Sequence, residues 1–533
     1  MHLPKSLSFN RLLLVVTAML ISIPMLLSSP AFAKDTLTLA ITGEPAEGYD
    51  PTLGWGRYGS PLFQSTLLKR DANMNIVKDL ATEYSLSNDS LTWHVTIRDD
   101  VKFSDGTPLT AEDVAYTFNT AAASGGKVDL LKFDTAKAVG KFKVEFKLKK
   151  RDSTFINRFI SLGIVPMASH GPEYARSPIG SGPYKMLEWN EGQQMIAEVN
   201  PHYYDSKPNF KRLVFLFTNE DTSFAAAKTG KVDIIVVPQA LAVQTIPGMK
   251  MHPVKSVDNR GLMFPVVPDT GKKNKNGAPI GNNVTCDVAI RKAANVAIDR
   301  DMLVSGVLEG FGRPAYGVCD GLPWDNPANK VKDADPNAAR KILADAGWKD
   351  TDGDGIVEKN GQKAEFTIIY PATRSIRQYL ALACADMLKK IGINAKVEGK
   401  RSWDEIKQRM HSDVIVFGWG SHDPIEIYHL YSSHHAGDGW NNPAFYKNNK
   451  VDEYLDKAIS AASYEESLDY WKKAQWDGTT GFNAKGDAPW AWLVNLDHTY
   501  FLSEHLDVGT SQVEPHGHGW PITANIQTWK WID

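Results

Sequence analysis

The segment FTIIYPATRSIRQYLALACADMLKKIGINAKV, residues 366–397, decides the fold class of this chain. Its first five residues contain two isoleucines and two aromatic residues, which predicts a buried strand. Residues 375–391 predict a long helix, and residues 395–397 predict a second strand. A strand, a helix and a strand in this order predict a βαβ unit, and therefore an α/β fold with parallel strands.

The same alternation of strands and helices continues on both sides of this segment. The sequence predicts helices at 288–297, 300–308, 337–346 and 403–411, and a buried strand at 413–417. In the first half it predicts strands at 36–41, 93–98, 141–149 and 213–217, a hairpin-like pair at 180–185 and 194–199, a buried strand at 232–237, and helices near 60–67, at 111–121 and at 221–229. Thr110 is expected to cap the helix at 111–121, with Asp113 facing the cap.

The length of the chain indicates more than one core. At 533 residues we expect two or three domains. We assign residues 34–275 to a first lobe, completed by residues 497–533, and residues 276–496 to a second lobe. Two short strands predicted at 491–495 and 500–502 would return the chain to the first lobe. Two α/β lobes joined by several crossings imply a cleft between them, where ligands usually bind.

The N-terminus has the three parts of a secretory signal. Lys5 and Arg11 precede an apolar run, Leu12–Leu27, and the segment ends at Ala33 in an Ala-x-Ala pattern. This predicts a signal peptide over residues 1–33 that is cleaved to leave a periplasmic protein. The alternative is an uncleaved membrane anchor, which the shortness of the run disfavours. No cysteine follows the cleavage point, so lipid attachment there is excluded.

Charge and cysteine content narrow the classes of partner and site. The net charge of −3 argues against nucleic acid as the partner. An oxidising compartment permits one disulfide among Cys286, Cys319 and Cys384. We favour Cys286–Cys319, because these two flank one helical segment. The chain has no Cys-x-x-Cys spacing, which argues against a metal site built from cysteines.

Two loops rich in histidine and aromatic residues form the candidate binding surface. The first follows the strand at 413–417 and reads FGWGSHDPIEIYHLYSSHHAGDGW, residues 417–440. The second is PHGHGWP, residues 515–521. We expect the two loops to meet across one cleft and to hold a small polar ligand that carries a metal. Imidazole nitrogens suit nickel, copper, zinc and cobalt, while calcium and magnesium prefer oxygen. The alternative for each histidine is an ordinary position on a surface loop.

Several segments are similar to one protein family over nearly the whole mature chain. They are WHVTIRDDVKFSDGTPLTAEDVAY (93–116), GSGPY (180–184), NPHYY (200–204), AAKTGKVDI (226–234), VAIRKAANVAID (288–299) and ADAGW (344–348). The chain resembles the family 5 extracellular solute-binding proteins of ABC importers, whose members include peptide- and nickel-binding components. The resemblance implies the two-lobe periplasmic binding protein fold, with a hinge and an interlobe ligand cleft. It also implies delivery of cargo to an ABC permease in the inner membrane. Cargo would shift the hinge toward the closed state only if it bound that state more tightly than the open one.

The resemblance suggests nickel- or metallophore-binding members in particular. Trp419 and His435 match the positions where an aromatic residue and a histidine contact a metal chelate. The loop at 515–521 is similar to members in which a loop histidine completes the coordination of nickel held by free histidines or by an opine-type metallophore. One departure is that residues 162–166 contain no arginine, although some nickel binders use one there to hold the chelator; Arg158 is the nearest.

These observations give the following candidates. The metal candidates are His516, His518, His435 and His434, and the ligand-binding candidates are Trp419, His422, Asp423, Trp440, Arg260, Arg374 and Arg377. The three arginines would bind the carboxylates of a chelator in paired hydrogen bonds. We expect no prosthetic group, a nickel(II) chelate as transported ligand, and a monomer.

Three alternatives stay open. The first is a di- or oligopeptide as cargo, because peptide binders of the family anchor the amino terminus on an acidic residue and Asp423 could serve. The second is a secreted metal-dependent hydrolase that uses His434, His435 and Asp438, although no hydrolase motif is present. The third concerns residues 350–355, DTDGDG, which start like a calcium loop; Gly361 stands where that motif needs a glutamate, so we interpret them as a turn.

Overall fold

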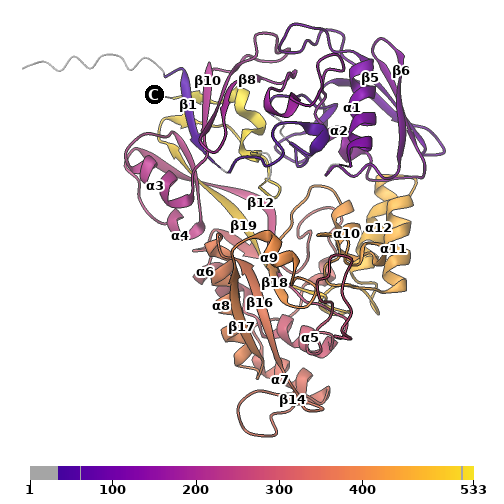
Figure 1. Ribbon diagram of the computed structural model, residues 1–533, viewed down its shortest axis with the longest axis vertical. Coiled ribbons are helices and arrows are strands. Elements are labelled where there is room, and N and C mark those ends of the chain that lie inside the picture. Colours follow the sequence, from indigo (N-terminus) through magenta and orange to yellow (C-terminus); the bar gives the residue numbers. More distant parts are fainter. Residues whose placement is uncertain (1–33, 42, 60–61, 126, 518–519, 533) are drawn as a thin grey trace, which may run out of the picture. The chain divides into compact units, whose positions relative to one another are not determined.

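The computed structural model describes residues 34–41, 43–59, 62–125, 127–517 and 520–532 (Figure 1). Its elements belong to one compact unit, Asp35–Asp533. The predicted signal peptide, residues 1–33, lies outside the described residues. Within the described residues, no helix has both the length and the apolar character needed to cross a membrane.

Eleven strands of the described chain form one mixed sheet. Ten of them follow the order β17-β16-β18-β12-β19-β11-β1-β10-β9-β8, and β13 pairs with β19. β16 lies parallel to β17 and β18, and β1 lies parallel to β10 and β11, whereas β12 is antiparallel to β18 and β19. The bounds are β1 (Thr36–Ala40), β8 (Tyr184–Asn190), β9 (Gln194–Val199), β10 (Arg212–Leu216), β11 (Ile234–Val237), β12 (Met249–Met263), β13 (Gly312–Pro314), β16 (Glu365–Pro371), β17 (Asn394–Lys400), β18 (Val414–Phe417) and β19 (Trp490–Ser503).

The βαβ unit predicted from residues 366–397 is present. β16 and β17 pair in parallel over seven residues, and α8 (Ser375–Lys389) connects them. One face of α8 packs into the core against Ile368 of β16 and Val414 of β18. The buried positions on that face recur every three or four residues, as a helix requires: Leu380, Ala381, Cys384, Met387 and Leu388. The parallel α/β prediction is therefore confirmed for this part of the chain.

A four-stranded antiparallel sheet is formed by the first half of the chain. Its order is β4-β5-β7-β6, and its bounds are β4 (Ala81–Leu86), β5 (Thr92–Ile97), β6 (Phe133–Gly140) and β7 (Lys143–Leu148). The helix α1 (Ala111–Ser124) packs on it, with Phe118 in contact with the rings of Phe133 and Phe146. The predicted cap of α1 is present, because the Thr110 N–H donates to Asp113 Oδ2 at 2.8 Å.

The remaining elements surround these two sheets. The helices are α2 (Ile156–Ser161), α3 (Glu220–Lys228), α4 (Gln239–Ala242), α5 (Val288–Ala297), α6 (Arg300–Gly306), α7 (Pro336–Asp345), α9 (Trp403–Lys407), α10 (Ile425–Tyr431), α11 (Asn449–Ser460) and α12 (Tyr464–Gln475). Short strands pair as β2 (Leu68–Arg70) with β3 (Ile76–Lys78), β14 (Glu358–Lys359) with β15 (Gln362–Lys363), and β20 (Leu506–Asp507) with β21 (Lys530–Trp531). Short 3-10 helices occur at Pro51–Leu53, Tyr174–Arg176, Pro327–Asn329, Ser433–His435 and Pro521–Thr528.

The two long strands β12 and β19 stand in the middle of the large sheet (Figure 1). They pair antiparallel from Met249↔Ser503 to Met263↔Trp490. The register shifts between Lys255 and Asn259, where the regular ladder is interrupted. Asp258 lies inside this interruption and is therefore available to side chains outside the sheet.

Several sequence predictions differ from the structure. Residues 62–67, the described part of the helix predicted near 60–67, contain no helix. Their backbone is instead bonded to distant segments, because the carbonyl of Phe63 accepts from Gly182 N–H and that of Ser65 accepts from Ile164 N–H, both at 2.9 Å. The two short strands expected at 491–495 and 500–502 are one continuous strand, β19. The lobe boundaries at 275/276 and 496/497 stay predictions.

The predicted disulfide is wrong, because Cys286, Cys319 and Cys384 are free thiols. Cys319 is buried, and its Sγ lies 3.6 Å from Oε1 of Gln475. Cys286 is half-buried at the start of α5, close to the positive charge of Arg291. Flanking a helix in the sequence did not place these two sulfur atoms together.

Candidate functional site

A cleft of about 2060 Å³ opens between segments far apart in the sequence. Its wall includes residues 54–59 from the first part of the chain, residues from the segments 127–134 and 157–161 beside the four-stranded sheet, residues from the segment 417–441, and residues 516–517 and 520–524. Most of the predicted site residues line it: Trp419, His422, Asp423, Trp440, Arg260, Arg374, Arg377, His435 and His516. His434 is not among the described lining residues, and His518 lies outside the described residues.

Two glycines let the loop after β18 run close to β12. The Trp419 N–H donates to Asn259 Oδ1 at 3.0 Å, and the Asn259 N–H donates to the Trp419 carbonyl at 2.9 Å. A Cβ at Gly418 would stand 2.1 Å from the Asn259 carbonyl oxygen, and one at Gly420, where φ is +149°, would stand 2.5 Å from the Val257 carbonyl oxygen. Glycine is therefore required at both positions, and it holds Trp419 at the wall of the cleft.

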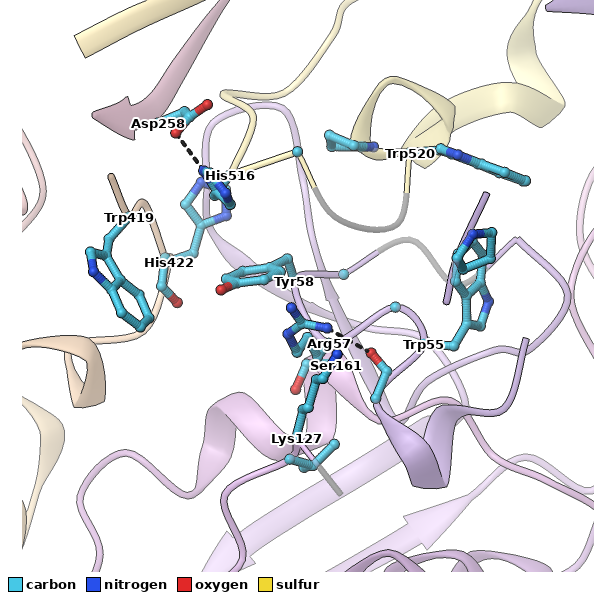
Figure 2. Close-up of a pocket in the computed structure, with 18 of the residues that line it drawn as sticks. Trp55, Arg57, Tyr58, Lys127, Ser161, Asp258, Trp419, His422, His516 and Trp520 are labelled. Atoms are coloured by element: carbon cyan, nitrogen blue, oxygen red, sulfur yellow. Dashed lines mark hydrogen bonds and ion pairs between the residues drawn. The ribbon is translucent and has the colours of Figure 1, made fainter. Parts of the chain in front are cut away.

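His422 is a buried imidazole at the cleft wall. Its Nε2 has no hydrogen-bond partner among the described residues. Burial, reinforced by the positive charge of Arg70, lowers the pKa of His422 to about 3, so the ring is neutral at neutral pH. The backbone carbonyl of His422 accepts from Arg70 Nη2 at 2.9 Å, which holds the loop in place. In Figure 2 the His422 side chain extends toward His516, with Tyr58 and Trp419 nearby.

His516 connects the second predicted loop to the first. The backbone N–H of His516 donates to the carbonyl of Gly420 at 2.8 Å, so the two loops are in contact, as expected. Its Nδ1 lies 2.5 Å from Asp258 Oδ1, on β12 (Figure 2). Burial lowers the pKa of His516, although Asp258 opposes this effect. A carboxylate on one ring nitrogen is the arrangement that orients histidines for metal binding.

Asp258 is the centre of a charged network. Besides His516 it accepts from Arg260, with Arg260 Nη2 at 3.1 Å, and its Oδ2 lies 3.3 Å from Nε2 of His498. Burial alone would raise the pKa of Asp258, but Arg260 and the two histidines bring that pKa well below its usual range. His498 lies between Asp258 and Glu514; burial would lower its pKa, but the two carboxylates raise it to about 10.

The three predicted arginines differ in their surroundings. Arg260 is already paired with Asp258. Arg377 is buried, donates to the Val416 carbonyl at 2.8 Å and lies 5.5 Å from the centroid of the Trp403 ring. Burial and the nearby charge of Arg260 lower the pKa of Arg377 well below its usual value, and none of the described carboxylates pairs with it directly. Arg374 is exposed at the start of α8. Together they give this part of the cleft an excess of positive charge.

Asp423 does not present a free carboxylate. Its Oδ2 is hydrogen-bonded to Nη1 of Arg158, and its Oδ1 accepts from the Ile425 N–H at 3.1 Å. Arg158 comes from α2, far away in the sequence, and both side chains are almost fully buried. Nearby, His429 Nε2 lies 2.9 Å from Asp129 Oδ2, a second contact between the two halves of the wall.

The two histidines at 434 and 435 point to different places. His435 lines the cleft and packs edge-on against His429, with ring centroids 5.2 Å apart. His434 is exposed and faces Asp456 at 3.8 Å. Asp438 lies 3.8 Å from His435. His435 therefore lies at the candidate site, whereas His434 is not among the described residues that line the cleft.

The predicted Asp/Gly turn lies outside the cleft. Residues 350–355 form bends without a regular element. Ligand atoms of Asp350, Asp352 and Glu358 lie within 4.8 Å of one another, but Lys363 already forms ion pairs with Asp352 and Asp354. These contacts agree with the interpretation of the segment as a turn.

The sequence predictions missed the part of the wall that comes from the first half of the chain. Arg57, Tyr58 and Arg70 belong to it, together with Asp129 and Arg158. One signal was available: residues 54–59, GWGRYG, repeat the Gly-Trp-Gly pattern of residues 418–420. Both segments place aromatic and basic or imidazole side chains at the same cleft (Figure 2).

Comparison with known proteins agrees with this architecture. Residues 75–441 match the model of the bacterial extracellular solute-binding proteins, family 5 middle region. Protein XP55 of Streptomyces lividans is 34% identical over 90% of this chain and 87% of its own length. NikZ from Campylobacter jejuni, solved in complex with Ni(L-His), has 26% identity and a TM-score of 0.78, covering 93% of this chain and 99% of its own.

A peptide binder is similarly related. The oligopeptide-binding protein AppA from Bacillus subtilis, solved in complex with a nonapeptide, has 25% identity and a TM-score of 0.72, covering 94% of this chain and 99% of its own. The fold is thus the mixed α/β, two-lobe periplasmic binding protein fold. Proteins of this kind bind small ligands or peptides outside the cytoplasm and act with an ABC permease, so the hydrolase alternative is set aside. This chain belongs to family 5 of the bacterial extracellular solute-binding proteins and is the solute-binding protein of an ABC importer.

Proposed function

We propose that the cargo of this binding protein is a chelated transition metal. The first candidate is nickel held by free histidine or by an opine-type metallophore. The observation that carries the proposal is His422, which offers a neutral imidazole with an unpartnered Nε2 at the wall of the cleft. A buried polar nitrogen without a partner is costly, and coordination to a metal ion would satisfy it.

Other features of the wall support this cargo. Asp258 orients the ring of His516 through Nδ1, as carboxylates commonly do behind metal-binding histidines. Arg377 has no direct carboxylate partner in the part of the chain that the structure describes, so its positive charge suits the carboxylates of a chelator. One or two protein histidines on an otherwise chelated ion would also permit release, which a closed site of four protein ligands would hinder. A relative of known structure, NikZ, was solved with Ni(L-His).

A peptide is the second candidate cargo. The cleft volume of about 2060 Å³ exceeds the roughly 300–1,000 Å³ typical of small-molecule pockets. AppA, which is similar along nearly the whole chain, was solved with a nonapeptide. The state of Asp423 argues in the other direction, because Arg158 already neutralises the carboxylate that would attract an amino terminus.

The test is a binding titration of the mature protein. Calorimetry and thermal shift would compare free nickel(II), nickel(II) with excess L-histidine, and a mixture of di- and oligopeptides. The variants are His422→Ala and His516→Ala, with the exposed His434→Ala as the matched control. Cargo at a hundred times its Kd stabilises a folded protein by about 2.7 kcal/mol.

We expect the chelated nickel to bind the wild type and His434→Ala alike. Removing either wall histidine should weaken this binding at least tenfold. Binding of peptides alone, unchanged in both wall variants, would overturn the proposal and favour a peptide importer.

A further inference from the structure

The ion pair between Arg158 and Asp423 is a buried part of the cleft wall. Arg158 is 5% exposed and Asp423 is 7% exposed. Both oxygens of Asp423 have donors, Arg158 Nη1 on Oδ2 and the Ile425 N–H on Oδ1. Arg158 is held in turn by Nε, which donates to the Asp129 carbonyl at 2.7 Å. Each partner is therefore fixed from its own side of the cleft.

The Arg158–Asp423 ion pair changes the charge that the cleft wall presents to cargo at Asp423. An unpaired carboxylate in a desolvated cleft would attract a protonated amine strongly. With Arg158 in place the pair is neutral, and an incoming ammonium group would have to displace a guanidinium. Displacement would leave that guanidinium buried without its partner, which is strongly unfavourable. The second terminal nitrogen of Arg158, Nη2, is buried and has no hydrogen-bond partner among the described residues.

We propose that Arg158 determines the specificity of this cleft by excluding cargo that carries a free ammonium group at Asp423. The inference rests on the proposed function in taking the cleft as the cargo site. It also sharpens that function. An amino nitrogen that coordinates a metal has given up its extra proton and bears no ammonium charge, whereas the same amino acid without metal carries one. The pair thus favours a loaded chelator over an empty one and over peptides with a free amino terminus.

The primary test uses the wild-type protein and metal-free ligands. Calorimetry in the presence of a chelating buffer would compare L-histidine with Nα-acetyl-L-histidine, and trialanine with N-acetyl-trialanine. Exclusion predicts that in each pair the free amine binds no more than threefold more tightly than its acetylated counterpart. A larger preference for the free amine would overturn it.

Variants then identify the residue responsible. Arg158→Gln should create a preference of at least tenfold for the free amines, and Arg158→Gln combined with Asp423→Asn should abolish that preference. A folded Arg158→Gln protein, checked by circular dichroism, that shows no preference would refute the role of Arg158. If this single variant does not fold, the wild-type comparison still decides the proposal. Because no nickel is present in these titrations, the result is independent of whether chelated nickel binds.

Discussion

The buried histidine of the cleft makes a specific prediction about stability and pH. In the folded protein the pKa of His422 is lowered to about 3, whereas an exposed histidine in the unfolded chain titrates near 6.5. Between these two values the unfolded state binds one more proton at this site than the folded state. The free energy of unfolding must therefore fall as the pH decreases below about 6.5.

The magnitude follows from the pKa of the unfolded chain. At about pH 5 the folded ring is still neutral, whereas the unfolded ring is about 1.5 pH units below its pKa and is protonated. The free energy of unfolding is therefore about 2 kcal/mol lower at about pH 5 than at about pH 7.5. His422→Gln keeps a polar side chain of similar size without a titrating ring. The ligand-free variant should therefore lose about 2 kcal/mol less than the wild type between these two pH values.

Urea unfolding of the ligand-free protein, at both pH values, measures this difference directly. Other buried groups titrate in both proteins, so their contributions cancel. His434→Gln is the matched control, because the side chain of His434 is 63% exposed and its removal should leave the pH dependence of the wild type unchanged. If wild type and His422→Gln change in parallel within about 0.5 kcal/mol, the ring is not held neutral by burial and the reasoning is wrong.

Three further predictions concern the loop, the ion pair and the thiols. Gly420→Ala should abolish cargo binding and destabilise the protein by about 1–3 kcal/mol, because φ is +149° there and the added Cβ would stand 2.5 Å from the Val257 carbonyl oxygen. Gly171→Ala is the control, because its φ is not positive and no atom lies within 4 Å of an added Cβ, so it should keep binding. Calorimetry and urea unfolding would separate the two, and retained binding in Gly420→Ala would contradict the close approach. Asp423→Asn should lower the free energy of unfolding by about 3–5 kcal/mol, because it leaves Arg158 buried without its partner. The double change Arg158→Met with Asp423→Leu should lower it by less. Equal losses in urea unfolding would show that the two side chains are not coupled. A thiol reagent should titrate three cysteines in the denatured, unreduced protein and at most the one half-buried thiol in the native protein, whereas a single reactive thiol after denaturation would reveal a disulfide.

Local sequence patterns predicted the parallel part of the large sheet well. The segment at 366–397 combines an apolar strand, a helix with a regular buried face and a second strand. All three predicted elements, and the parallel pairing of the two strands, are present in the structure. β12 was missed because its sequence, MKMHPVKSVDNRGLM, mixes charged residues and a proline into a strand. Its eight C-terminal residues are nevertheless buried, since the neighbouring strands and the charged network around Asp258 cover them.

The candidate site was predicted only on one side. Histidines and aromatic residues after a buried strand indicated the Trp419–His422 loop and the His516 loop, because such side chains are conspicuous in the sequence. Arg158 was not chosen, because a single arginine on a short helix carries no local signal of its partner. The pairing of Arg158 with Asp423 depends on a contact across 265 residues of sequence, which only the tertiary structure supplies.

The place of β19 in the sheet has a consequence for how the chain can assemble. This strand is made of residues 490–503, yet it lies between β12 and β11 and pairs with both. Before it is added, β17-β16-β18-β12 and β11-β1-β10-β9-β8 are two separate sheets, each with an unpaired edge where β19 will lie. A polypeptide that leaves a ribosome or a translocation channel with its N-terminus first therefore acquires this central strand after every other described strand of the large sheet. His516 emerges later still, so a chain stalled before residue 490 has neither a continuous sheet nor a finished place for cargo.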